Sequence, residues 1–475
     1  MRPGNKVGVR HAVAAGAGIM LAVAITVVGV AVTAEPARQP GQPQLTVAGI
    51  AQDPCQLQRA WPIPTRLSGQ FELDSSILRT AGGVYVTAGH LVPLTPAEAA
   101  CVAATERADR DWLRAGLVPG VTAAQRSMAT RALLDLRLAV RPNGAVLIGW
   151  RSGWRYVWPR DASWVAVALT DTGHPAMAYQ ILRFLERIQA ADGTWAARYL
   201  PDGSSPVRDG RPAELDAVGW VPWAVWSWAI TQQLRSKSQS RRELALLWPM
   251  VTRAADAAAR SLSPDGLPGP ALDYWERPVE VTLGTAAPLL VGLRAAADLG
   301  AQIGGTTAEG DARRWAAAAA GLSRAIAATF ARTGYQRTPT GSGADAAVTF
   351  LGPPFARPGP ALLRAARSVQ QTLTLGNGGL RPGAAWPGTP GVAWTSETAF
   401  FALFDATTGQ HRQAAALLAW LAAHRTRLGS LPEKVNSAGQ PASVAPLSWT
   451  DAVTLLALLA QTGQLSTVPV PPAGH

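Results

Sequence analysis

The sequence predicts an all-α fold, a barrel of six inner helices covered by six outer helices. Apolar residues recur at the helical period of 3.6 through most of the chain. Nearly all-apolar runs alternate with amphipathic ones, as expected for an inner ring inside an outer ring. Similar helix starts also recur, such as Trp158-Pro-Arg-Asp161 and Trp394-Thr-Ser-Glu397. An open helical solenoid is the alternative, but the repeats are irregular in length and their loops are long.

The N-terminal segment, residues 1–34, is predicted to be a signal peptide or a signal anchor. Basic residues precede an uncharged run from Ala12 to Ala34, which is long enough to span a bilayer. A positively charged flank stays on the cytoplasmic side of the membrane, so the rest of the chain is expected to be extracytoplasmic. It is either anchored to the membrane by this helix or secreted after cleavage.

The rest of the chain divides into four parts by composition and periodicity. Residues 35–66 are rich in Pro and Gln and are predicted to form a tether, and 67–95 a small β-hairpin region packed on the barrel. The barrel spans 96–465, and 466–475 are predicted to be a disordered tail. Twelve helical runs are expected, at 96–115, 122–139, 161–171, 175–190, 213–233, 242–262, 284–300, 308–331, 360–372, 395–407, 410–425 and 448–462.

Composition excludes several classes of function. Of the 475 residues, 48% are hydrophobic and 16% charged, which is typical of a folded chain with a large core. The net charge of +12 comes from scattered Arg, so no nucleic-acid partner is expected. The six His have no metal-ligand spacing and there is no nucleotide-binding motif, so neither a metal nor a cofactor is predicted. We expect a monomer.

The chain contains two cysteines, Cys55 and Cys101. Outside the cytoplasm such a pair tends to oxidise, and a disulfide would join the N-terminal arm to the first helix. Two buried free thiols are the alternative.

Long loops are expected before the inner helices, at 141–160, 192–213, 263–283, 374–394 and 427–447. They carry Trp, Arg and a few carboxylates, which is what a sugar pocket needs. Glu276 follows Trp275 at a loop–helix junction, where desolvation would raise the pKa of its carboxyl, unless it is an ordinary helix-entry Glu. Glu433 lies in a second such loop far along the chain, which favours a catalytic pair.

From about residue 120 to 465 the sequence resembles the family 15 glycoside hydrolases, the glucoamylase group, which are (α/α)6 barrels. Five motifs in matching order carry the resemblance: Tyr156-Val-Trp-Pro-Arg-Asp161; Arg211-Pro-Ala-Glu-Leu-Asp216; Leu272-Asp-Tyr-Trp-Glu276; Gly378-Gly-Leu-Arg381; and Leu431-Pro-Glu433-Lys-Val with Pro446-Leu-Ser-Trp-Thr-Asp-Ala452.

The resemblance implies a role for each matched residue. Glu276 corresponds to the general acid of the family and Glu433 to its general base. Six further residues would bind the substrate or line its pocket: Trp158, Arg160, Asp161, Asp216, Trp275 and Arg381. The sequence departs from the family at Arg277, where a second acid is common, and at Lys434, where Gln is usual. We expect both cations to point away from the acid.

The expected function is therefore an inverting, exo-acting α-glucoside or α-glucan hydrolase that takes oligosaccharides or polysaccharides. A trehalase or a dextran-type exo-glucosidase of the same family is one alternative. The other is a surface glycan-binding protein that keeps the barrel but has lost turnover.

Overall fold

The structure, a computed structural model, describes residues 41–466 apart from 57–58, 88, 234–236 and 277–278. The predicted signal segment, Arg277 and nearly all of the predicted tail lie outside the described residues. Within those residues, no helix combines the length and the apolar character needed to cross a membrane.

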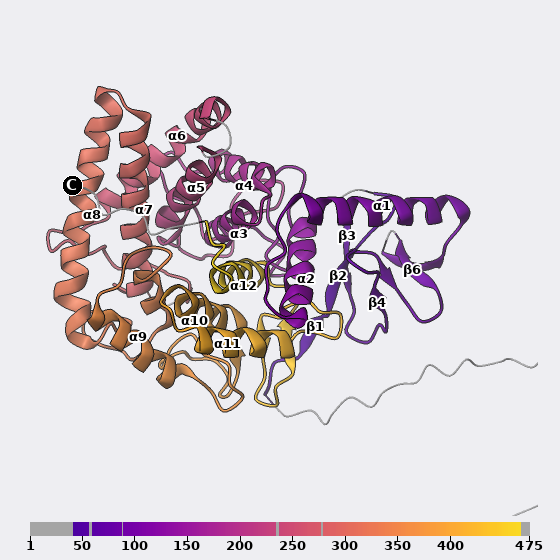
Figure 1. Ribbon diagram of the computed structural model, residues 1–475. Coiled ribbons are helices and arrows are strands. Elements are labelled where there is room, and N and C mark those ends of the chain that lie inside the picture. Colours follow the sequence, from indigo (N-terminus) through magenta and orange to yellow (C-terminus); the bar gives the residue numbers. More distant parts are fainter. Residues whose placement is uncertain (1–40, 57–58, 88, 234–236, 277–278, 467–475) are drawn as a thin grey trace, which may run out of the picture. The chain divides into compact units, whose positions relative to one another are not determined.

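Six helical elements form a closed inner ring in which each packs on the next and the last packs on the first (Figure 1). They are buried along most of their length, which accounts for their apolar sequences. In ring order they are α3 (Pro159–Asp171), α5 (Ala217–Gln233), α7 (Leu283–Ile303), the 3₁₀ helix η2 (Ala346–Leu351), α10 (Thr395–Thr407) and α12 (Ser448–Gln461).

An outer helix packs on each inner element and completes the all-α barrel that the sequence predicts. In the same ring order these helices are α4 (Pro175–Arg187), α6 (Lys237–Arg260), α8 (Thr306–Thr329), α9 (Pro360–Leu373), α11 (His411–Ala423) and α2 (Ala123–Ala139). In α9, for example, Leu362, Ala366, Val369 and Leu373 form a single buried stripe, which is the amphipathic pattern seen in the sequence.

Aromatic side chains fill the centre of the ring. Trp164 of α3 lies with its ring centroid 5.2 Å from both Trp220 and Trp223 of α5 and 5.5 Å from Phe355. All four side chains are nearly inaccessible to solvent. Many of the eighteen tryptophans are therefore core residues, and those near the starts of the inner helices are left to contact a ligand.

All twelve predicted helical runs contain an α-helix, but one prediction of their placement is wrong. Helix α1 (Pro96–Ala115) lies outside the ring and packs on α2 and on the β region (Figure 1). The 3₁₀ helix η2 takes the place in the barrel that was expected for α1, and residues 352–359 connect η2 to α9. Another 3₁₀ helix, η1 (Phe330–Thr333), directly follows α8. The six residues between Asp345 and Gly352 are too few to show a helical period, so η2 could not be predicted from periodicity.

In the part of the chain that the structure describes, three small β-sheets accompany the barrel. One has the order β1 (Leu45–Val47), β10 (Pro441–Val444), β9 (Lys434–Val435) and β8 (Ala393–Trp394), and a second pairs β2 (Gly49–Gln52) with β3 (Ala60–Ile63). The third is the predicted hairpin region: β4 (Gln70–Phe71), β5 (Leu78–Arg79), β6 (Val84–Thr87) and β7 (His90–Pro93).

The prediction of a tether over residues 35–66 is wrong from Leu45 onward. Strands β1 to β3 lie there, and Ala48, Ile50 and Ala51 are buried. The apolar run from Leu45 to Ala51 explains the difference, because it has a core to pack against.

Cys55 and Cys101 are free thiols in the structure, and the disulfide stays a prediction. The two side chains are neighbours, and the hydrogen bond with Cys101 is the main influence that raises the pKa of the Cys55 thiol to about 11.

Candidate active site

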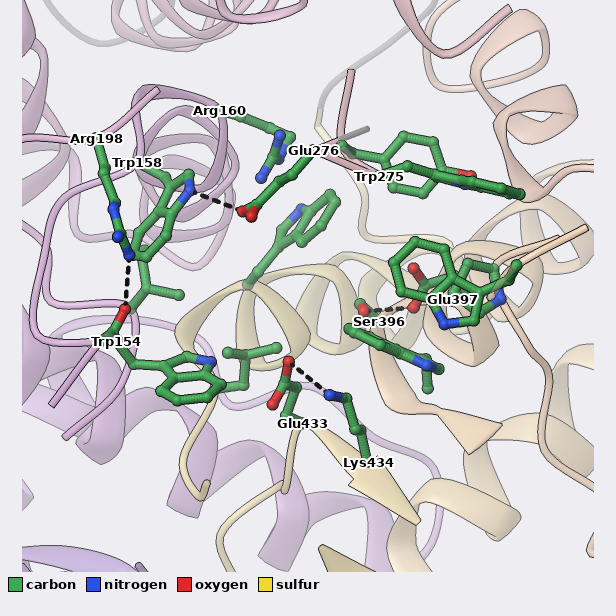
Figure 2. A pocket seen from close by; sticks show the side chains of 18 of the residues that line it. Trp154, Trp158, Arg160, Arg198, Trp275, Glu276, Ser396, Glu397, Glu433 and Lys434 are labelled. Atoms are coloured by element: carbon green, nitrogen blue, oxygen red, sulfur yellow. Dashed lines mark hydrogen bonds and ion pairs between the residues drawn. The ribbon is translucent and has the colours of Figure 1, made fainter. Parts of the chain in front are cut away.

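The loops that precede the inner helices enclose a cavity of about 380 Å³ (Figure 2). Six tryptophans form most of its wall: Trp154, Trp158, Trp275, Trp386, Trp394 and Trp449. Its charged lining consists of Arg160, Arg198, Arg211, Glu276, Glu397, Glu433 and Lys434. The prediction that aromatic, arginine and acidic side chains collect in these loops is confirmed.

A buried ionic network fixes the turn that carries Glu276. Arg337 is 2% exposed, and its Nη1 lies 2.9 Å from Asp273 and 3.0 Å from Asp345, whose side chains are fully buried. The Arg337 guanidinium also lies 3.7 Å from the centroid of the Trp275 ring. Glu276 has φ +58°, a left-handed conformation that residues other than Gly rarely adopt. The network therefore holds a strained turn that directs Glu276 into the cavity.

Among the described residues, the Glu276 carboxylate has two side-chain partners. Trp158 Nε1 donates a hydrogen bond of 3.2 Å to Oε1 (Figure 2). Arg211 forms an ion pair with Oε2. Arg211, the first residue of the second motif, thus brings positive charge next to the candidate acid, a contact that the motif alone does not predict.

Glu433 enters the cavity just before strand β9. Its backbone N–H donates to Val444 of β10, and its carbonyl accepts from Thr395 at the start of α10. Ser443 donates a hydrogen bond to Oε2, and Lys434 Nζ lies 3.5 Å from Oε1. The short sheet therefore positions Glu433 through both its backbone and its neighbours.

Lys434, which was expected to point away from the candidate acid Glu276, lines the cavity and lies beside Glu433. Lys434 and Trp394 are register partners across β9 and β8, and the ammonium lies 4.1 Å from the Trp394 ring centroid. Cross-strand partners project to the same face, so the pairing of these two strands directs both side chains inward.

Arg160 lies at the floor of the cavity, 4% exposed, within a cluster of three buried carboxylates. Its Nε donates to Asp161 at 3.1 Å, and its Nη1 contacts Glu214 and lies 3.3 Å from Asp216. Burial raises the pKa of Asp161 to about 7 and that of Asp216 to about 6, although Arg160 opposes both shifts. The three carboxylates hold the Arg160 guanidinium in place. The central carbon of this guanidinium, Cζ, lies 4.8 Å from the centroid of the Trp449 ring.

The structure separates the predicted site residues into two groups. Glu276, Glu433, Trp158, Arg160 and Trp275 line the cavity together. Asp161 and Asp216 are buried against Arg160 and are not among the lining residues, and neither is Arg381, whose neighbour Pro382 is.

Sequence reasoning missed three charged lining residues. Glu397 was noticed only as a repeated acid at a helix start, and Arg211 only as part of a motif. Nothing in the sequence pointed to Arg198, which lies 4.7 Å from the Tyr156 ring centroid and pairs with Asp209. Within the part of the chain that the structure describes, no group of His, Cys, Asp and Glu could hold a metal ion.

Comparison with curated proteins gives one partial likeness. No family model matches the chain. An uncharacterized glycosyl hydrolase of Methanocaldococcus jannaschii is 25% identical over 175 residues, which are 36% of this chain and 26% of that protein. The chain therefore spans about a quarter of the length of the curated relative it matches.

Solved structures match over most of the barrel. A bacterial glucoamylase complexed with acarbose is 15% identical at a TM-score of 0.59, with 79% of this chain and 63% of that chain covered. The glucoamylase from Saccharomycopsis fibuligera is 12% identical at a TM-score of 0.56, covering 70% and 92%. The family 15 glucoamylase from Hypocrea jecorina is 16% identical at a TM-score of 0.54, covering 72% of each chain. The chain has the fold of the family 15 glycoside hydrolases, as its motifs predict.

Proposed function

We propose that the protein is an extracytoplasmic, inverting glycoside hydrolase that removes glucose from the ends of α-glucosides or α-glucans. The observation that supports this best is that Glu276 and Glu433 enter one tryptophan-walled cavity from different loops (Figure 2). Glycoside hydrolysis needs two carboxyl groups that flank the scissile bond. Indole faces suit the apolar faces of sugar rings. The buried floor around Arg160 favours entry of a chain end over the middle of a chain.

Glu433 is the general base of the proposed reaction and takes a proton from the attacking water. A base has to be ionised before it can accept a proton. The Lys434 ammonium and the Ser443 hydroxyl both contact this carboxylate, and both stabilise a negative charge on it.

Glu276 is the general acid and protonates the glycosidic oxygen. The Trp158 indole N–H orients one oxygen of this carboxyl. The contact with Arg211 has to open before Oε2 of Glu276 can approach the glycosidic oxygen, because the guanidinium occupies that oxygen. Arg211 is 35% exposed, so its side chain has room to move to a sugar hydroxyl when a substrate enters.

Glucose release from a panel of α-linked glucose disaccharides, trehalose, dextran and short glucans tests the activity. Glu276→Gln and Glu433→Gln are each expected to lose about 10²- to 10⁴-fold in kcat. A glycosyl fluoride needs little protonation, so Glu276→Gln should retain more of its activity on the fluoride than on a disaccharide. Glu433→Gln should not recover with the fluoride, but added azide should restore turnover because it attacks without deprotonation. Wild-type rates in both variants would exclude the proposed roles.

A glycan-binding protein without turnover is the second candidate, and the Arg211–Glu276 ion pair favours it. If the pair stays closed, Arg211 keeps Oε2 of Glu276 from a sugar. Calorimetry on the same glucans distinguishes the two functions, since binding without release of glucose supports the second one.

The extracytoplasmic location is tested separately. Protease added to intact cells should cleave the protein, and protection that is lost only on lysis would contradict this part of the proposal.

A further inference from the structure

A third carboxyl group, that of Glu397, belongs to the cavity and has no role in the reaction described above. Glu397 lies in the first turn of α10 and is 2% exposed. Ser396 Oγ donates a hydrogen bond of 2.6 Å to Glu397 Oε2 (Figure 2). Among the described side chains, no Lys, Arg or His forms an ion pair with it. Glu276 and Glu433, by contrast, each contact a cation.

The surroundings of Glu397 favour its neutral form. Burial is the main influence that raises the pKa of this carboxyl to about 7, and the negative charges of Glu433 and Asp345 act in the same direction. The hydrogen bonds from Ser396 and from its own backbone oppose the shift without cancelling it. The hydroxyl of Tyr274, which also lines the cavity, donates a hydrogen bond to Asp345. A protonated carboxyl has one O–H donor, which an ionised one lacks.

Asp405 gives a useful contrast, because it is a second buried carboxyl on the same helix. Its pKa is also raised by burial, to about 6, but Gln370 donates to it and it does not line the cavity. Asp405 is therefore satisfied within the protein. Glu397 faces the space where a ligand would lie, and its only side-chain donor among the described residues is the neighbouring Ser396.

We propose that Glu397 is a specificity-determining residue that, in its protonated form, donates a hydrogen bond to a hydroxyl oxygen of the sugar bound in the cavity. The proposal rests on the proposed function, which supplies the sugar, but it concerns binding and not the chemical step. A buried donor of this kind favours a sugar with a hydroxyl at that position, because a ligand without one leaves the donor unpaired.

The test measures affinity for the best-bound α-glucose disaccharide of the panel by calorimetry, in protein that carries Glu276→Gln and so does not turn it over. For a donor with a pKa of about 7, about 97% is protonated near pH 5.5 and about 3% near pH 8.5, so the Kd should rise by up to about 30-fold between them. Adding Glu397→Gln keeps the size of the side chain and an N–H donor at every pH, so most of this rise should disappear. Asp405→Asn is the matched control and should leave the rise intact.

Glu397→Leu removes the donor and should weaken binding at both pH values, with thermal unfolding used to check that it is folded. The proposal is overturned if the Glu397→Gln protein shows the same rise in Kd as its parent, or if the Glu397→Leu protein binds with unchanged affinity. Because the readout is binding, a wild-type protein that binds but never hydrolyses removes the proposed hydrolase and leaves this inference standing. Hydrolysis with affinities that do not depend on residue 397 removes only the inference.

Discussion

Replacing Arg337 with Met should destabilise the protein strongly, because it leaves two buried carboxylates without their cation. The guanidinium contacts Asp273 and Asp345, both fully buried, at 2.9 and 3.0 Å. Removing one partner of a buried ion pair typically costs about 3–5 kcal/mol, because the remaining charge is uncompensated. We expect a loss of this size in the free energy of unfolding at neutral pH.

The loss should also depend on pH. Burial raises the pKa of Asp345 above its usual value, and Arg337 opposes the shift, so removing Arg337 raises the pKa further. A carboxyl whose folded pKa exceeds its unfolded value binds protons more tightly in the folded state. It therefore adds stability at low pH that is lost as the pH rises through the folded pKa. The Arg337→Met protein should be closer to wild type near pH 5 than near pH 7.

Equilibrium unfolding in urea at the two pH values measures both effects. Arg294→Met is the matched control. Arg294 is partly buried and donates a hydrogen bond to the Ser323 hydroxyl, and among the described residues no carboxylate forms an ion pair with Arg294. It should lose little stability, and equally at both pH values. Adding Asp345→Asn to Arg337→Met should restore part of the loss. A cost below about 1 kcal/mol for Arg337→Met, or one that is the same at both pH values, would refute the reasoning.

Three further predictions concern the site. Arg160→Lys should lower kcat/KM by about 10²-fold, because a point charge cannot reproduce the contacts of a planar fork with Asp161 and its neighbours; unchanged kinetics would mean that Arg160 only supports the helix start. Gly383→Ala should impair activity, since a Cβ at this position would lie 2.2 Å from the Trp275 ring. A Cβ at Gly376 would have no other atom within 4 Å, so Gly376→Ala should leave activity unchanged in the same assay. The first glucose released should have the β configuration by NMR before mutarotation, and an α product would exclude single displacement.

The helices could be predicted because burial of one stripe leaves a period of 3.6 in the sequence, and burial of the whole surface leaves a long apolar run. The candidate acid and base were found because each lies in a long loop with a recognisable neighbour. The direction of the Lys434 side chain was not predictable, because β9 is only two residues long and shows no alternation. Glu397 was overlooked because an acid in the first turn of a helix is common, and only the tertiary structure shows that this one reaches a cavity.

The pairing of β1 with β10 has a consequence for the order in which the protein folds. Thr46 donates a hydrogen bond to the carbonyl of Ser443, a residue 397 positions later, and Ser443 also contacts Glu433. Strand β1 leaves the ribosome early and has no partner in this sheet until β10 has been made. Contacts between such distant segments form late and slow the folding of a chain. We therefore expect the loop that carries Glu433 to become ordered only after synthesis of the barrel is nearly complete, so that in nascent chains Glu433 does not yet face the candidate acid Glu276.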